Sequence, residues 1–273
     1  MPVASHTSMP KLASPRTDSV AILLPGQTPS ARALGLRVGS ASHPAPGKPN
    51  EDFHAVVTPY DAEGLRQSVV LAIADGVSGS ALARVASEVT VRSVVADYYS
   101  TPAHWSVGRA LDRLLRSAND WLWAQNARRP DEDCVVTAIS IVVLRDQHYY
   151  LAHVGDTRVY RCRERVFKQL TSDHTWQRKD MRHVLRRAVG LDRHLVVDFA
   201  DGELRAGDVF LMVSDGVWEV LGEFAMTEIL HRDLEPQPLA QALVQAAVRH
   251  QAAYMGRNDA TAIVFRVDAL VEA

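Results

Sequence analysis

The sequence predicts a layered α+β domain, because short apolar segments typical of strands occur in clusters and long amphipathic segments separate these clusters. Hydrophobic residues make up 47% of the 273 residues and charged residues 23%, which is the composition of an ordinary globular protein. A chain of this length can bury a large core without disulfide bonds. Strands and helices do not alternate strictly, so a sheet built from βαβ units is not expected.

Residues 1–30 are expected to form a flexible arm, and residues 31–270 a single folded domain. The arm is rich in Ala, Ser, Pro and Thr, so it cannot bury enough apolar surface to offset the entropy lost on ordering. From residue 34 onward the composition changes, and neither an internal repeat nor a low-complexity stretch follows.

Seven short segments are typical of β-strands. Several are unbroken apolar runs, and such strands need cover on both faces. The segments 137–144 and 149–154 are separated by a short polar turn, which predicts a β-hairpin, and the next two segments are expected to continue the same meander. The predicted strands are 69–74, 137–144, 149–154, 158–160, 166–168, 209–213 and 262–267.

Three longer segments carry apolar residues at helical spacing and would supply this cover. They span residues 81–99, 106–126 and 238–254. In the second of them, Leu111 and Leu115 recur on one stripe of the helix together with other apolar residues. We therefore expect helices packed on the faces of the predicted sheet.

Charge, hydropathy and cysteine usage exclude several functional classes. Lys and Arg number 30 and Asp and Glu 32, so a net charge of -2 offers no electrostatic footprint for nucleic acid. No apolar run approaches the ~20 residues that span a bilayer, and no signal-peptide pattern is present. Cys134 and Cys162 predict neither a disulfide framework nor a thiolate metal site. We expect a soluble cytoplasmic protein without a nucleic-acid or membrane partner.

Three apolar strands run almost directly into an aspartate, and these aspartates are Asp75, Asp156 and Asp215. Burial raises the free energy of an ionised carboxylate, and several of them close together are less favourable still. A bound divalent cation reverses this effect, and Mg²⁺ and Mn²⁺ prefer oxygen ligands. The pattern therefore indicates a metal site at the strand ends.

Each aspartate alone has a plain structural interpretation, since Asp-Gly is a common turn dipeptide. The three strand ends occur together with the acidic pair Glu51 and Asp52 and with Asp259. This combination favours a metal-binding carboxylate cluster over three unrelated turns. It requires that strand ends distant in the sequence meet in space.

Five short motifs in this order resemble those of the metal-dependent serine/threonine protein phosphatases of the 2C type, the PPM family, in its bacterial branch. The resemblance covers about residues 34–268. No single motif is specific, but five in the correct order form a strong signal. The motifs are NED at 50–52, DGVSG at 75–79, GDTRVY at 155–160, SDGVW at 214–218 and NDATAIV at 258–264.

The resemblance implies a fold of two packed antiparallel β-sheets flanked by helices, an α-β-β-α sandwich, with the domain at 31–270 as the phosphatase domain. It also implies hydrolysis of phosphoserine and phosphothreonine in proteins by attack of a metal-bridging hydroxide. Two Mn²⁺ or Mg²⁺ ions would be the cofactors, with a third ion at an additional, weaker site. Phosphorylated proteins and a serine/threonine kinase would be the partners, and we expect a monomer.

The same resemblance implies a role for each acidic residue. Asp75 would bridge both ions, and the Gly76 carbonyl would bind one of them. Asp215 would bind the other ion, and Asp156 would serve a weaker third ion. Glu51 would contact one ion directly or through water, supported by Asp52. Asp75 and Asp215 are therefore the expected catalytic residues.

Two positions depart from the family pattern. The family motif Asp-Asn-x-Thr is reversed here, so either Asn258 lies at the ligand position or a local backbone shift brings in Asp259, which we slightly favour. A phosphate-binding Arg is replaced by Gly47, and Lys48 is the nearest base, although a solvated loop lysine is an equal alternative.

These departures leave a second function open, namely a catalytically weakened relative that binds phosphoproteins as a regulator. A third is a relative dedicated to one bacterial regulator of the anti-sigma type. Among the other residues, we expect His153 to be buried in the core or an interface, with a ligand role as the alternative. We expect His174 to be a surface loop histidine, with the orientation of a group near the cleft as the alternative. Trp218 is expected to be a core or helix-packing residue.

Overall fold

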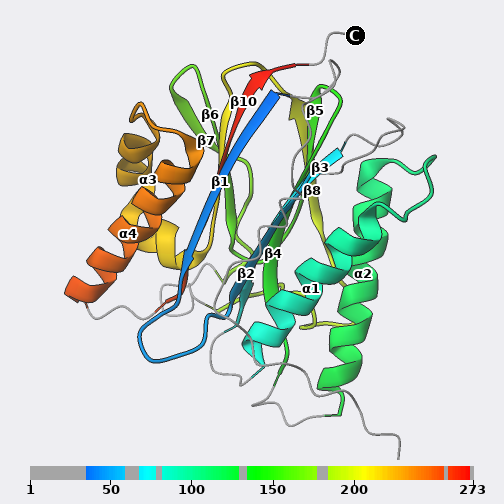
Figure 1. Cartoon of the computed structure of the whole chain (residues 1–273). Helices are drawn as coiled ribbons and strands as arrows, with labels where there is room; N and C mark the ends of the chain where they lie inside the picture. The colour runs from blue at the N-terminus through cyan, green and yellow to red at the C-terminus, as the bar shows by residue number, and fades with distance from the viewer. Residues whose placement is uncertain are drawn as a thin grey trace, which may run out of the picture.

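The strands of this chain form two antiparallel sheets in a computed structural model that describes residues 35–58, 68–77, 82–128, 134–176, 184–254 and 258–270. Within these residues each sheet has five strands (Figure 1). The first sheet, in spatial order, contains β1 (Gly35–His43), β10 (Ala260–Ala269), β9 (Val209–Val213), β6 (Arg158–Arg163) and β7 (Val166–Gln169). The second contains β2 (Asp52–Val57), β3 (Ser68–Gly76), β4 (Thr137–Arg145), β5 (His148–Val154) and β8 (Asp198–Glu203).

Helices cover the outer face of each sheet (Figure 1). The second sheet is covered by α1 (Ala83–Tyr98) and α2 (Val107–Asn126). The first is covered by α3 (Asp215–Leu230) and α4 (Pro236–Tyr254). The predicted α-β-β-α sandwich is confirmed. None of these helices is both long and apolar enough to cross a membrane.

Three apolar layers hold the sandwich together. One lies between the two sheets, and the other two lie between each sheet and its helices. Strand β3 shows why the sequence runs apolar without alternation: Leu71 and Ile73 face the other sheet, while Val70 and Ala72 face the helices. Both faces of this strand are buried, as its composition predicted.

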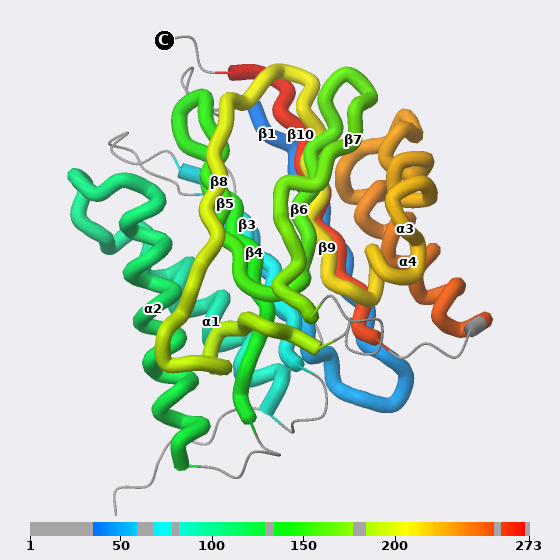
Figure 2. Tube along the Cα trace, turned by 180° about the vertical axis from the view of Figure 1, so that it is seen from behind, coloured from blue at the N-terminus to red at the C-terminus, as the bar shows by residue number. Residues whose placement is uncertain are grey.

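All seven predicted strands and all three predicted helices occur in the structure. The predicted hairpin is confirmed, because β4 and β5 pair antiparallel from Ile139–Val154 to Arg145–His148. The predicted meander is wrong at the next step, from β5 to β6, although β6 and β7 do pair antiparallel as consecutive strands. Strand β6 leaves the sheet of β5 and pairs with β9 and β7 in the other sheet, as Figure 2 shows from behind. Gly155, with a φ of 109°, lies where the chain crosses over.

Four elements have no clear signal in the sequence. Strand β1 has a single buried residue, and β8 is a largely exposed edge strand of polar composition, so neither shows an apolar pattern. Strand β2 is short. Helix α3 contains Gly222 at a φ of 66°, which interrupts the helical geometry. The arm predicted for residues 1–30 lies outside the described residues.

The antiparallel pairing brings the predicted motifs to one end of the sandwich. In the second sheet, Asp52 at the start of β2 lies opposite Asp75 at the end of β3. In the first sheet, Ala262 near the start of β10 lies opposite Val213 at the end of β9. The crossing from β5 to β6 occurs at the same end. Six strand termini from both sheets therefore meet there, namely those of β2, β3, β5, β6, β9 and β10.

Gly39 on β1 provides a test of how closely α4 packs on the first sheet. A Cβ atom at this position would lie 2.2 Å from the backbone nitrogen of Gln237 in α4. We expect Gly39→Ala to lower the free energy of unfolding by about 1–3 kcal/mol through overpacking. Gly108→Ala is the control, since nothing lies within 4 Å of its new Cβ atom, and it should be neutral or stabilising by up to about 1 kcal/mol. Equal free energies of unfolding for the two variants, measured in urea, would contradict this close packing.

Candidate metal centre

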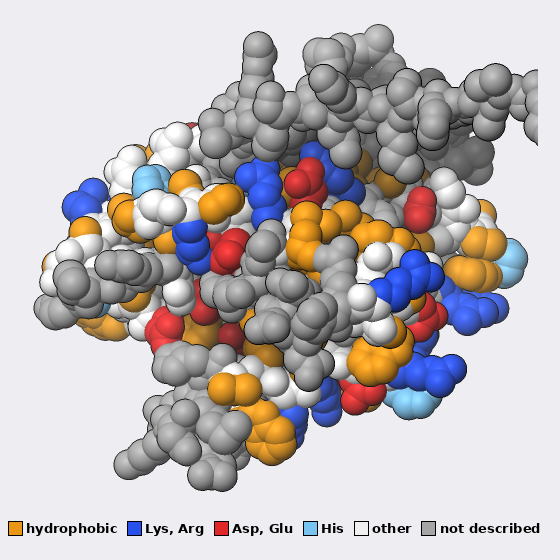
Figure 3. Space-filling view, turned by 90° about the horizontal axis from the view of Figure 1, so that it is seen from below, with side chains coloured by type: hydrophobic (Ala, Val, Ile, Leu, Met, Phe, Trp, Pro, Cys, Tyr) orange, Lys and Arg blue, Asp and Glu red, His pale blue; other side chains and the backbone are white. Residues whose placement is uncertain are grey.

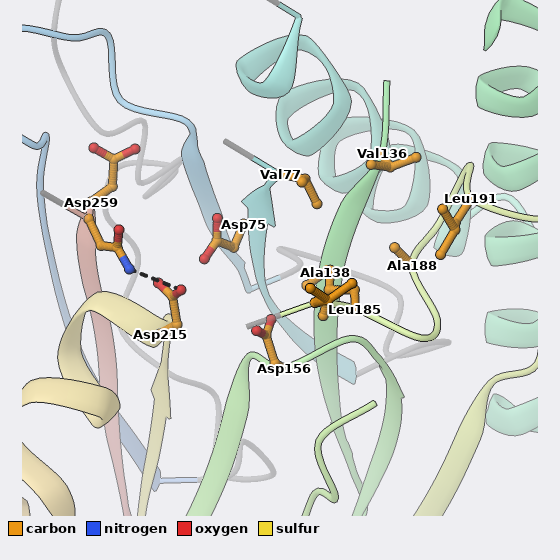
Figure 4. A pocket seen from close by; sticks show the side chains of 12 residues that line it. Asp75, Val77, Val136, Ala138, Asp156, Leu185, Ala188, Leu191, Asp215 and Asp259 are labelled. Carbon is orange, nitrogen blue, oxygen red and sulfur yellow. Dashed lines mark hydrogen bonds between the residues drawn. The ribbon is translucent and has the colours of Figure 1, made fainter. Parts of the chain in front are cut away.

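A pocket of about 560 Å³ opens at the end of the sandwich where the strand termini meet. Figure 3 shows the molecule from this end, with acidic and hydrophobic side chains both at the surface. Asp75, Asp156 and Asp215 line the pocket together, although 140 positions separate the first from the last. Figure 4 shows their carboxylates on the same side of it. The structure thus brings together the three strand-end aspartates.

Asp75 is held by its neighbours in the second sheet. Its carbonyl oxygen accepts a hydrogen bond from the Thr137 hydroxyl at 2.7 Å, and the next amide, that of Gly76, donates to the Glu51 carbonyl at 3.1 Å. Gly76 is required here, because a Cβ atom would lie 2.1 Å from the carbonyl oxygen of Ala83. The start of α1 therefore closes against the Asp75 turn.

Asp215 begins α3 immediately after β9. The preceding Ser214 donates its hydroxyl hydrogen to Asp52 Oδ2 at 2.7 Å and accepts the Thr261 amide at 3.0 Å, so it ties the two sheets together. Asn258 donates from Nδ2 to Asp215 Oδ2 at 3.1 Å. The Asp215 carboxylate is thus held by Asn258, two residues before β10, at the start of a helix that Ser214 ties to both sheets.

Asp156 lies in the turn between β5 and β6. Its carbonyl oxygen accepts a hydrogen bond from the Trp218 indole nitrogen at 2.9 Å. The Arg158 guanidinium stacks on Trp218, 3.4 Å from the ring centre, and also contacts Asp173 at 2.6 Å. Side chains from β6, α3 and the segment after β7 therefore fix this turn.

The loop before β2 carries the remaining predicted residues. Asp259 accepts backbone hydrogen bonds at both oxygens, from Ala45 at 2.6 Å and from Glu51 at 2.7 Å. In Figure 4 its carboxylate points away from Asp215. Lys48 Nζ lies 2.5 Å from Glu51 Oε2 and 3.8 Å from Asp259 Oδ2. The Lys48 ammonium thus faces acidic residues of this end of the molecule.

Burial, with a contribution from neighbouring negative charges, raises the pKa of four aspartates at this end, Asp52, Asp75, Asp156 and Asp215. Burial raises the pKa of Asp75 well above its ordinary value, and the charges of Asp52, Asp215 and Asp156 add to the effect. Burial and then the charge of Asp215 raise the pKa of Asp156 to about 8. Burial raises the pKa of Asp52 to about 7 and that of Asp215 to about 6. The cluster therefore resists full ionisation unless a positive charge enters it.

The donor atoms present fit a hard divalent cation. Carboxylate oxygens, the Gly76 carbonyl and the free amide oxygen of Asn258 are the ligand types that Mg²⁺ and Mn²⁺ prefer. Among the described residues, no group of three or more His, Cys, Asp or Glu side chains has the arrangement of a metal site. Asp75, Asp156 and Asp215 instead line an open pocket, which leaves room for water or substrate.

Three other residues contribute to this site in ways that the sequence did not indicate. Trp218 is half-buried and packs against the apolar layer between α3, α4 and the first sheet, and it also supports Asp156 from α3. Arg158 contacts both Trp218 and Asp173. Gln251 in α4 donates to the Gly216 carbonyl at 2.9 Å and accepts the Asn258 amide at 3.0 Å. The quoted motifs contained Trp218 and Arg158, but nothing in the sequence links the distant Gln251 to them.

The prediction that His174 is a surface residue is wrong, because its side chain is buried. Its amide donates to the Gly155 carbonyl at 2.7 Å, and its Nδ1 accepts the Gly155 amide at 3.1 Å. Its Nε2 lies 2.9 Å from Asp198 Oδ2. His153 is buried as predicted and packs its ring on that of His174, with ring centres 4.8 Å apart. His174 therefore supports the turn that presents Asp156.

Comparisons with known proteins identify the same family of enzymes. A family model described as protein phosphatase 2C matches residues 40–258. The serine/threonine phosphatase stp of Listeria monocytogenes is 26% identical over 199 residues, covering 66% of this chain and 77% of that protein. PstP of Mycobacterium tuberculosis is 26% identical over 195 residues, which is 66% of this chain and 37% of PstP.

Solved structures share the fold. The catalytic domain of PstP in complex with two manganese ions superposes with a TM-score of 0.70 at 26% identity, covering 86% of this chain and 99% of that one. PppA, described as a regulatory component of the type VI secretion system (T6SS) in Pseudomonas aeruginosa, superposes with a TM-score of 0.68 at 24% identity, covering 85% and 97%. At that identity the second likeness concerns the fold alone.

The raised pKa values predict an unusual pH dependence for the metal-free protein. With a pKa of about 8 for Asp156 and about 7 for Asp52, the folded state takes up protons between pH 9 and pH 7, whereas an unfolded chain does so only near pH 4. Folding is therefore favoured as the pH falls through this range. Asp156 should contribute about 1 kcal/mol of added stability at pH 7 relative to pH 9.

Urea unfolding in the presence of EDTA at both pH values measures this effect. Asp156→Asn should reduce the difference between the two pH values, because the amide does not titrate. Asp112→Asn, on the exposed face of α2, should leave it unchanged. Equal stability of the wild-type protein at pH 7 and pH 9 would contradict the electrostatic description of the pocket.

Proposed function

Since this chain belongs to the protein phosphatase 2C family, we propose that its pocket hydrolyses phosphoserine and phosphothreonine in proteins with the help of two Mn²⁺ or Mg²⁺ ions. The observation that carries the proposal is the convergence of Asp75, Asp156 and Asp215 on one open pocket. Their unfavourable burial together is relieved by divalent cations. The manganese-bound structure of PstP, which is 26% identical to this chain, supports the choice of metal.

The acidic residues would hold the ions in the following way. Asp75 lies at the end of β3 among Asp52, Asp215 and Asp156, so it is the best-placed carboxylate to bind two ions at once. The Gly76 carbonyl and Asp215 would each bind one of them, and Glu51 would reach the same ions directly or through water. Asp156, in the turn where the chain crosses from β5 to β6, would hold a third ion more weakly.

When bound, such ions acidify a water molecule, neutralise the phosphate charge and stabilise the leaving oxygen of an in-line displacement. The protein supplies orientation. Ser214 and Asp52 link the two sheets beneath Asp75 and Asp215, and Trp218 holds the Asp156 turn. Lys48 would move its ammonium from Glu51 toward the incoming phosphate as Glu51 takes up its ligand role.

We further infer that Asn258, not Asp259, faces the ions at the fifth motif. The Asn258 amide nitrogen donates to Asp215, which leaves its carbonyl oxygen available toward the pocket. Both oxygens of Asp259 are engaged by the amides of Ala45 and Glu51. This revises the preference drawn from the sequence. Asp259 would then hold the loop that carries Lys48 and Glu51.

The setting of the reaction is also part of the proposal. A phosphatase of this kind would act in the cytoplasm as a monomer, in a signalling circuit opposite a serine/threonine kinase. Cys134 and Cys162 are both free thiols, which suits a reducing compartment. The domain at 31–270 would carry the whole catalytic site.

Asp75→Asn is expected to reduce Mn²⁺-dependent hydrolysis of p-nitrophenyl phosphate and of a phosphoserine peptide at least about 100-fold, because it removes the charge that both ions would share. Asp112→Asn on α2 is the matched control and should retain full activity, since Asp112 only pairs with Arg116 at the surface. The measurement is initial rate against Mn²⁺ concentration.

The alternative of a non-enzymatic regulator makes the opposite prediction. A wild-type protein that binds the phosphopeptide at millimolar Mn²⁺ without turnover would establish the regulator and overturn the proposed activity. Undiminished turnover by Asp75→Asn would overturn the assignment of that residue. Turnover confined to a single protein substrate would instead favour the dedicated relative.

The assignment of Asn258 has its own test in Mn²⁺ binding measured by calorimetry. Asn258→Asp should tighten binding by about tenfold, because it adds a carboxylate beside Asp215 at the ligand position. Asp259→Asn should change Mn²⁺ affinity much less but lower the free energy of unfolding, because it weakens the hold on the loop before β2. If Asp259→Asn abolishes binding while Asn258→Asp has no effect, Asp259 is the ligand.

A further inference from the structure

The pocket has two unlike walls. On one side lie the carboxylates described above, and on the other lies a surface of Val, Leu and Ala side chains, as Figure 4 shows. None of the described pocket residues on that second side is charged. We call it the aliphatic wall, and it consists of Val77, Val136, Ala138, Val184, Leu185, Ala188 and Leu191.

Three residues of the aliphatic wall are unusually accessible for their type. Val77 is 36% exposed, Val184 46% and Leu191 41%, although all three line a hollow rather than a convex surface. Scattered exposed apolar residues are ordinary on a soluble protein. Apolar side chains gathered in a pocket beside a polar centre instead mark a binding surface.

The aliphatic wall is attached firmly to the sheet and to α2. Thr137, the first residue of β4, and Val189 exchange backbone hydrogen bonds at 3.1 and 2.9 Å, and these bonds connect the wall to β4. The Gly190 amide donates to Asn119 at 2.8 Å, and its carbonyl accepts from Asn126 at 3.0 Å, both residues of α2. A wall anchored on two sides is preformed, so little ordering entropy opposes binding to it.

We propose that the aliphatic wall binds an apolar side chain next to the phosphorylated residue of the protein substrate, an inference that rests on the proposed phosphatase function. With the phosphate at Asp75 and Asp215, the adjoining residues of the substrate must pass over the other wall of the same pocket. An apolar neighbour would bury its surface there at about 25 cal/mol per Å². A charged neighbour would lose its hydration and gain no partner from the described residues of that wall.

Acidic neighbours are disfavoured by the aliphatic wall, because a carboxylate would lose its hydration there and gain no partner from the described residues of that wall. The enzyme should therefore prefer phosphorylated sites embedded in apolar sequence over sites in acidic sequence. The pocket volume, about 560 Å³, lies within the range of ~300–1,000 Å³ that is typical of ligand-binding pockets.

Phosphoserine peptides that differ at one position test this preference with the full chain and Mn²⁺. Leu, Gln or Asp would stand directly before the phosphoserine in one series and directly after it in a second. At one of the two positions we expect kcat/KM for Leu to exceed that for Gln by about tenfold, and that for Asp by more. The difference should lie mainly in KM, because the contact is the same in ground and transition states.

Variants of the aliphatic wall locate the preference. Val184→Ser and Leu191→Ser should each reduce the ratio of kcat/KM between the Leu and Gln peptides at least threefold. Val196→Ser is the matched control, since Val196 is 52% exposed but does not line the pocket, and it should keep the wild-type ratio. Thermal unfolding of all three variants checks that the fold is retained.

The outcomes separate this inference from the proposed function. Hydrolysis of p-nitrophenyl phosphate with equal kcat/KM for the Leu and Gln peptides in both series would overturn the inference and leave the phosphatase function intact. An unchanged ratio in Val184→Ser and Leu191→Ser would also overturn it. If the wild-type protein hydrolysed none of these substrates, both the proposed function and this inference would be overturned.

Discussion

Carboxylates of like charge, gathered in a partly buried pocket, are the constraint around which this molecule is organised. Burial raises the pKa of Asp75, Asp156 and Asp215, and the charge of Asp215 further raises the pKa of the other two, so their assembly opposes folding unless protons or cations join them. The fold must supply the opposing stability elsewhere. It does so through three apolar layers whose residues are almost completely excluded from water.

The pocket is shared between the two sheets, and this gives the inter-sheet contacts a functional meaning. Asp75 belongs to one sheet and Asp215 to the other, so the distance between them is set by how the sheets pack. The hydrogen bond from Ser214 to Asp52 crosses this junction within the buried region. The close approaches at Gly76 and Gly216 leave no room for a side chain, so neither turn can relax by shifting.

Charge and recognition are divided between the walls of the pocket. The side of the pocket that carries Asp75, Asp156 and Asp215 would bind ions and phosphate, where charge dominates the binding free energy. The aliphatic wall would bind the polypeptide around the phosphorylated residue, where the buried apolar area dominates it. The reversed fifth motif fits this division. Both Asn258 and Asp259 line the pocket, but the group that contacts Asp215 is the uncharged amide of Asn258, while the Asp259 carboxylate is hydrogen-bonded to the loop before β2.

The sequence by itself determined the strands and helices with strong apolar periodicity, the acidic strand ends and the family resemblance, because these depend on local pattern. Weakly patterned elements such as β1, β8 and the interrupted α3 lay beyond it, since their positions depend on partners far along the chain. Only the tertiary structure decided that β6 crosses to the other sheet and that His174 is buried against Gly155. The tertiary structure also decided that both oxygens of Asp259 bind backbone amides. Asn258 and Asp259 are adjacent residues at the entrance to a strand, and such side chains face opposite ways. Their partners therefore depend on neighbours in space, which the sequence does not give.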